Sequence, residues 1–211
     1  MGGHEAGNQT DADWKEMKGA LGFILFWFAH NLFASDPIHL IKLNDTINPG
    51  SADFVIQRIN EANEAKAPFL IIQLDTPGGL LTSTRQIIQS ILNSKIPIIV
   101  WVGPQGAQAG SAGALITFAA DVAVMATGSN IGAAHPVQSS GQSLDATMND
   151  KITNDTAAFA EGVAKAKGRN FQWARQSVTE SKSVTAQEAL KLNVIDFIAD
   201  DISSLQKQLH Q

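Results

Sequence analysis

Short apolar runs alternate with segments of helical periodicity along most of the chain, and this alternation limits the possible folds most strongly. A run such as 69–74 (FLIIQL) is apolar throughout, which is typical of a strand buried on both faces. Strands separated by helical crossovers indicate βαβ units and a mainly parallel sheet, so we expect an α/β fold. The expected strands are 38–43, 69–74, 96–102, 121–125 and 194–198, and the expected helices begin at 49, 80, 111, 149, 185 and 202.

Composition excludes several classes of site. The 211 residues contain no cysteine, which excludes disulfides, thiolate zinc sites and a cysteine nucleophile. The five histidines lack a His-x-x-x-His spacing, so we expect neither a metal site nor a cofactor held by one. The net charge of −5 and the absence of a Lys/Arg cluster argue against nucleic acid as a partner.

The amino end has the features of a targeting segment. Residues 20–29 (ALGFILFWFA) form an apolar run of ten, which is short for a bilayer span but suits the core of a signal peptide, with Ala34 before the cleavage point. The acidic residues within 1–16 do not suit a basic leader, so we expect translation to begin at Met17 and 1–16 to be a start-site artefact. A buried hydrophobic helix is the alternative.

This segment divides the chain into parts with different expected roles. Residues 17–34 are expected to be a signal peptide or membrane anchor, and residues 35–211 the functional domain. The domain is then exported and lies in the periplasm or on the extracytoplasmic face of the membrane, where residues 20–34 can anchor it.

Two glycine-rich junctions carry the candidate chemistry. Residues 75–79 (DTPGG) and 107–113 (AQAGSAG) each follow a strand and precede a helix, and the carboxyl ends of parallel strands are where α/β sheets place their sites. Taken singly, the first is an ordinary turn and Ser111 an ordinary helix cap. Taken together, they predict a serine nucleophile beside backbone amides that bind an oxyanion. The glycines expected to support these loops are Gly78, Gly110 and Gly113.

A serine nucleophile requires a base, and the residues alone leave two candidates open. His135 is the first, with Asp121 or Asp145 to complete a triad. The nucleophile-elbow pattern Gly-x-Ser-x-Gly is nearly present, but position 109 is alanine, and an expected loop over 103–110 separates the strand from the serine. Both features weaken the histidine alternative.

Lys151 is the second candidate base. It precedes Ile152, which is expected to face inward, and a partly desolvated lysine has a lowered pKa that lets its neutral amine accept a proton from serine. A solvated surface lysine is the commoner state of this residue type. The spacing therefore does not choose between the two bases.

Four motifs in this chain together resemble the NfeD-type membrane-bound serine proteases, which are associated with stomatin-like proteins and belong to the Clp-protease/crotonase-like superfamily. The motifs are LDTPGGL at 74–80, AGSAG at 109–113, SNIGAAHPV at 129–137 and KITN at 151–154. The resemblance covers about residues 38–200 and implies a Clp-protease/crotonase-like fold of repeated ββα/βαβ units with flanking helices.

The resemblance also implies roles for individual residues. It makes Ser111 the nucleophile and Lys151 the general base of a Ser–Lys dyad. It assigns the oxyanion hole to the backbone amides of Gly79 and Ala112, and it makes His135 a structural residue. The implied activity is that of a serine endopeptidase.

The implied substrates are hydrophobic segments of membrane-associated proteins, such as a stomatin-like partner. We expect the substrate to bind as an added strand near the Gly78–Gly79 turn, under a lid formed by the polar loop 138–147. Members of this family assemble at least as dimers, so a homodimer or higher oligomer is expected. Two alternatives stay open: a non-catalytic scaffold for a stomatin-like protein, and a crotonase-like acyl-CoA enzyme that uses the same oxyanion hole.

Overall fold

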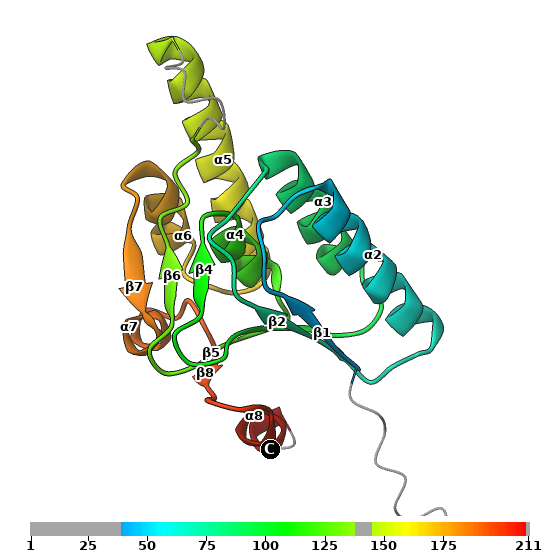
Figure 1. The fold of residues 1–211 in the computed structure, drawn as a ribbon. Coiled ribbons are helices and arrows are strands. Elements are labelled where there is room, and N and C mark those ends of the chain that lie inside the picture. Colours follow the sequence, from blue (N-terminus) through cyan, green and yellow to red (C-terminus); the bar gives the residue numbers. More distant parts are fainter. Residues whose placement is uncertain (1–38, 138–144, 210–211) are drawn as a thin grey trace, which may run out of the picture. The chain divides into compact units, whose positions relative to one another are not determined.

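Five short parallel strands form the central sheet of the computed structural model, which describes residues 39–137 and 145–209 (Figure 1). The strands that the apolar runs predict are present, although the last is shorter than expected. The predicted start-site artefact and targeting segment lie outside the described residues. In spatial order the strands are β1 (His39–Leu43), β2 (Leu70–Leu74), β3 (Ile98–Val102), β5 (Val122–Met125) and β8 (Phe197–Ile198).

Helices connect the strands, as the periodicity predicts. Asn48 begins the first helix with a capping box, in which its side chain accepts from the Ser51 amide and the Ser51 hydroxyl accepts from the Asn48 amide. Thr185 and Glu188 form a second capping box, at the start of the helix that the sequence predicts from residue 185. The helices are α2 (Pro49–Glu64), α3 (Leu81–Leu92), α4 (Ala112–Ala119), α5 (Ala146–Ala166), α6 (Phe171–Thr179), α7 (Ala186–Lys191) and α8 (Ile202–Leu209).

Both faces of the central sheet are buried, which explains the continuous apolar runs. On β3, Ile98, Val100 and Val102 pack into the main core beneath α2 to α7, whereas Ile99 and Trp101 pack toward α8. Figure 1 shows α8 on the side of the sheet opposite α2 and α3. No helix in the described ranges is long and apolar enough to cross a membrane.

The candidate nucleophile directly follows a strand of a second, smaller sheet. This sheet consists of β4 (Gln108–Gly110), β6 (Asn130–Gly132) and β7 (Ser183–Thr185), with β4 parallel and β7 antiparallel to β6. The loop expected over 103–110 is therefore wrong for its last three residues. Strands of three residues are too short to show a periodic pattern, so their pairing was not predicted.

Candidate active site

Ser111 lies at the turn between β4 and α4 in a strained conformation. Its φ of 47° and ψ of −107° lie in a region that is unfavourable for any residue except glycine. Its amide donates to the Gly132 carbonyl at 2.9 Å, which fixes the turn to the neighbouring strand. The side chain makes no capping hydrogen bond to α4, so the alternative of an ordinary helix cap is not supported. The hydroxyl remains available for chemistry.

The turn at Ser111 is as sharp as that of a nucleophile elbow. The loop that the sequence predicts between the strand and this serine argues against an elbow. The structure has no loop directly before Ser111, because β4 ends at Gly110 and α4 begins at Ala112. A strained residue between a strand and a helix places its side chain at the end of the strand, where it can contact a substrate.

Backbone hydrogen bonds join the two glycine-rich junctions. The Thr76 amide donates to the Gln108 carbonyl at 2.8 Å, and the Gly110 amide donates to the Thr76 carbonyl at 2.9 Å. The Asp75 carboxylate accepts from the Gln108 amide at 3.0 Å. The structure thus brings together the two motifs that the sequence placed about thirty residues apart, as expected for strand ends in a parallel sheet.

The three supporting glycines are packed too closely for a side chain. A Cβ added to Gly110 would lie 2.8 Å from the Pro77 carbonyl oxygen, and one added to Gly113 would lie 2.7 Å from Cγ2 of Thr76. At Gly78, where φ is +125°, a Cβ would lie 2.7 Å from the Cβ of Ser111. These contacts explain why glycine occupies these three positions.

Gly79 and Ala112 present free backbone amides beside this serine. Leu80 donates to the Ile47 carbonyl and Ile47 donates to the Gly78 carbonyl, each at 2.8 Å, and these bonds hold the chain around Gly79. Ala112 is the first residue of α4, so its amide has no partner within the helix. Neither the Gly79 amide nor the Ala112 amide has an acceptor within residues 39–137 or 145–209. Unpaired amides are the donors that an oxyanion hole requires, and the two amides predicted for it belong to residues that line one pocket with Ser111.

Ser111, Gly79 and Ala112 all line one pocket of about 440 Å³. Its walls come from the segment before α2, from the starts of α3 and α4, from the chain after β6 and from α5. Most of the lining is apolar, so the pocket suits an apolar side chain. The apolar lining residues are Ile47, Pro77, Leu80, Leu81, Leu115, Ala134, Pro136 and Val137.

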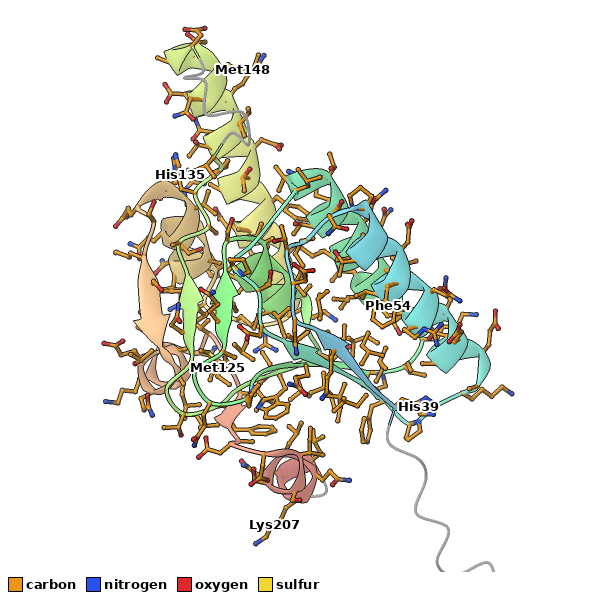
Figure 2. All side chains as sticks on the ribbon, viewed as in Figure 1. His39, Phe54, Met125, His135, Met148 and Lys207 are labelled. Carbon is orange, nitrogen blue, oxygen red and sulfur yellow. The ribbon has the colours of Figure 1, made fainter. Side chains whose placement is uncertain are left out.

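Lys151 does not line this pocket. It lies in the second turn of α5, near the end of the helix that Met148 marks in Figure 2. Its side chain is exposed although Ile152 is half-buried, so the partial desolvation expected for this lysine is wrong for the chain as described. The same helix reaches the pocket at Thr156, which is five residues or about 7.5 Å further along the axis.

His135 is occupied elsewhere, and the structure does not assemble the histidine triad. Its Nδ1 lies 3.1 Å from the Val178 carbonyl oxygen of α6 and donates to it. Figure 2 shows the histidine on the chain between β6 and α5. Asp121 lies at the amino end of β5 and accepts from the Ile98 amide and from Lys167. Asp145 accepts from the Thr147 amide at the start of α5.

The sequence matches the family described as NfeD1b, N-terminal domain, over residues 37–206. The chain belongs to this family. The resemblance to NfeD-type proteins that the four motifs indicate is thereby confirmed.

Two curated relatives of this NfeD1b domain extend well beyond it. Membrane-bound protease PH1510 of Pyrococcus horikoshii is 35% identical over 188 residues, which are 88% of this chain and 42% of the relative. Membrane protein NfeD1b of Bacillus subtilis is 28% identical over 185 residues, which are 82% of this chain and 41% of the relative. The chain spans less than half the length of these relatives.

Solved structures of 1510-N, described as a membrane-bound stomatin-specific protease, share the fold of this domain. A variant of it in which a lysine is replaced by alanine, in complex with a substrate peptide, matches with a TM-score of 0.76 and 35% identity over 83% of this chain and 80% of that chain. A variant in which a serine is replaced by alanine matches with a TM-score of 0.77 and the same identity over 83% of this chain and 86% of that chain. The α/β fold with a mainly parallel sheet and flanking helices is confirmed.

The sequence predicts neither the place of Thr156 in the pocket nor the positioning role of Asp75. Thr156 is buried on α5 and lines the pocket with Ser111. The sequence contained part of the signal, because Thr156 follows the inward-facing Ile152 by four residues and so lies on the same face of the helix. Which pocket that face meets depends on how α5 packs, and the NfeD1b sequence alone does not give that packing.

Proposed function

We propose that this chain is a serine endopeptidase that cleaves hydrophobic segments of membrane-associated proteins, stomatin-like proteins among them. The observation that carries the proposal is Ser111, a strained and uncapped serine in an apolar pocket with two unpaired amides. The descriptions of the solved relatives support it, since these are named stomatin-specific proteases and were studied as serine and lysine variants.

The proposed reaction is acyl transfer through Ser111. The neutral amine of Lys151 removes the hydroxyl proton, and the oxygen attacks the carbonyl carbon of the peptide bond. The amides of Gly79 and Ala112 donate to the oxyanion that forms, and Lys151 then protonates the leaving amine. Water attacks the acyl-enzyme with the same base, which releases the second product and restores Ser111.

Lys151 must approach Ser111 for this reaction, because a general base acts within hydrogen-bond reach of its proton. The exposed lysine lies on the part of α5 that precedes the pocket-lining Thr156. We propose that the first turns of α5 close toward Ser111 when a peptide fills the pocket. Such closure also removes the amine from water, which lowers the lysine pKa in the direction that a base requires.

The pocket lining and the relatives' names support the proposed substrate and location. An apolar pocket beside the nucleophile suits a hydrophobic residue at the cleaved bond, and we propose that the substrate binds as an extended strand beside the Gly78–Gly79 turn. The curated relatives are named membrane proteins. We propose that residues 17–34 export or anchor the chain, that the domain acts on the extracytoplasmic side, and that it works as a homodimer or higher oligomer.

Cleavage of a hydrophobic peptide library by the full chain in detergent, followed by mass spectrometry, tests the proposal. Ser111→Ala and Lys151→Ala should each reduce cleavage by at least about 1,000-fold, because the members of such a dyad act as a unit. Lys165→Ala is the matched control, since this lysine is also exposed on α5 but lies at its other end, and it should stay within about twofold of the unmodified chain.

Other results would contradict the proposal in distinguishable ways. A folded chain that cleaves no peptide but binds a stomatin-like protein would indicate the scaffold. Binding of a coenzyme A thioester, unaffected by Ser111→Ala, would indicate the crotonase-like enzyme. Cleavage by the Lys151→Ala variant would be consistent with Ser111 as the nucleophile but would exclude Lys151 as the base.

A further inference from the structure

Thr156 is a buried residue whose hydroxyl has no hydrogen-bond partner in the part of the chain that the structure describes. The residue is 1% exposed, lies on α5 and lines the pocket that contains Ser111. Thr153, one turn earlier, also has an unpaired hydroxyl, but it does not line that pocket. An unpaired buried hydroxyl is unfavourable, so a buried hydroxyl in a pocket wall points to a ligand that pairs with it.

Three other buried hydroxyls in the described helices, those of Thr84, Thr117 and Ser177, are paired in a simple way. Each donates to a backbone carbonyl about one turn earlier in its own helix, which is the usual solution for serine and threonine in helices. The bonds run from Thr84 to the Leu80 carbonyl (2.8 Å), from Thr117 to the Gly113 carbonyl (2.8 Å) and from Ser177 to the Ala174 carbonyl (2.7 Å). Thr156 makes no such bond, although the Ile152 carbonyl lies one turn earlier.

The contrast with Thr84 is informative because both threonines line the same pocket. Thr84 lies on α3 and Thr156 on α5, and both residues are fully buried. The Thr84 hydroxyl is bonded to the Leu80 carbonyl, so Thr84 has only its methyl group to present to a ligand. The Thr156 hydroxyl oxygen is itself buried in this conformation, but no bond within α5 holds it, so rotation about the Cα–Cβ bond can exchange the methyl and hydroxyl positions and bring the hydroxyl to the pocket.

We propose that Thr156 determines specificity by hydrogen bonding to a hydroxyl on the substrate side chain that enters the pocket. A threonine side chain matches this site, because its methyl group can meet apolar walls such as Leu115 and Ala134 while its hydroxyl pairs with Thr156. Valine has the same shape but leaves the Thr156 hydroxyl unpaired. The residue whose carbonyl Ser111 attacks is therefore preferably threonine rather than valine. This inference rests on the proposed function for the peptide nature of the ligand.

Peptide binding tests the inference without requiring cleavage. The full chain carrying Ser111→Ala is titrated by calorimetry with a valine-rich decapeptide and with a set in which each valine in turn is replaced by threonine. At one position the replacement should tighten binding about 3- to 10-fold, which is the effect of one neutral hydrogen bond. Adding Thr156→Val should abolish that gain, and Thr156→Ser should retain it because the hydroxyl is kept.

Thr84→Val in the same background is the matched control. It removes a hydroxyl that is bonded to Leu80, so it should change the affinities for valine and threonine peptides by the same factor. Circular dichroism and thermal unfolding verify that each variant is folded. Thr156→Ser remains informative where Thr156→Val fails to fold.

Three results would overturn the inference. The first is an equal preference for threonine in the Ser111→Ala chain and in the same chain that also carries Thr156→Val. The second is the absence of any peptide position at which threonine is preferred to valine. The third is the absence of peptide binding by a folded chain. Failure of the proposed function is a separate observation, since it appears as a lack of cleavage by the unmodified chain. Selective binding without cleavage would uphold the role of Thr156 and contradict the protease.

Discussion

Gly78 lies so close to Ser111 that a Cβ at position 78 would be 2.7 Å from the Cβ of the serine and 3.3 Å from its hydroxyl oxygen. Because glycine has only a hydrogen atom in place of this Cβ, it leaves room for the Ser111 side chain. Gly78 also has a φ of +125°, a conformation that other residues rarely adopt. Two independent constraints thus favour glycine here: the clash that a Cβ would make with Ser111 and the positive φ of Gly78 itself.

Gly78→Ala should lower the free energy of unfolding by about 3 kcal/mol, because it combines a steric clash with an unfavourable φ. Urea unfolding measures the change. Gly162→Ala is the control, since Gly162 lies within α5 and a Cβ there would meet nothing within 4 Å. That variant should be more stable by about 0.5–1 kcal/mol. A Gly78→Ala variant as stable as the unmodified chain would contradict the packing described for Ser111.

Ser111→Gly should raise the free energy of unfolding by about 1 kcal/mol relative to Ser111→Ala. Glycine tolerates a φ of 47°, whereas alanine keeps the strain of the native serine. Both variants lose the proposed nucleophile, so only their stabilities differ. Equal unfolding free energies for the two variants would show that the strain at this turn is negligible.

Asp196→Ala should destabilise the domain by about 3 kcal/mol. Its carboxylate accepts from the buried Arg169 guanidinium at 2.9 Å and from the Ala123 amide at 2.7 Å, and removing it leaves a buried charge without its partner. Asp155→Ala is the matched control, because Asp155 pairs with Arg85 at the surface and should cost less than about 0.5 kcal/mol. Similar losses in the two variants would mean that burial of Arg169 does not matter.

Glu188→Gln should reduce the loss of folding stability that occurs as the pH falls below neutral. Hydrogen bonds from the Thr185 amide and hydroxyl hold the pKa of Glu188 below its ordinary value of 4.5. A lowered pKa in the folded state gives stability that is complete above pH 4.5 and is lost as the pH falls through the folded-state pKa. Gln keeps the capping bond without the charge. Thermal unfolding from pH 7 to pH 3 should therefore show a smaller decrease for Glu188→Gln, and parallel curves would contradict the assignment.

The central sheet could be predicted from the sequence because its strands are apolar on both faces and are bounded by turn residues. The small sheet could not, since β4, β6 and β7 have three residues each and depend on pairing with segments far along the chain. The helix α6 was also missed, although Asn170 caps it and accepts from the Trp173 amide. Asparagine before an amphipathic segment is a recognised helix start, so that signal was available.

The candidate site was predictable to a different extent. Glycines and small residues indicate where a backbone must pass closely, so the two junctions and their meeting point could be predicted from residue type. The positive φ of Ser111 could not, because serine does not normally adopt it. Nor could the exposure of Lys151 or the unpaired hydroxyl of Thr156, which depend on helix packing and on a single side-chain rotation.

The bonds that join the two glycine-rich junctions run mainly between backbone groups, from Thr76 to Gln108 and from Gly110 to Thr76. Substitutions in the pocket walls leave such bonds intact, provided that the glycines are kept. The pocket walls can therefore vary while Ser111 and the backbone amides near it keep their positions. Under the proposed function, the same property makes the domain a suitable scaffold for engineering new cleavage preferences.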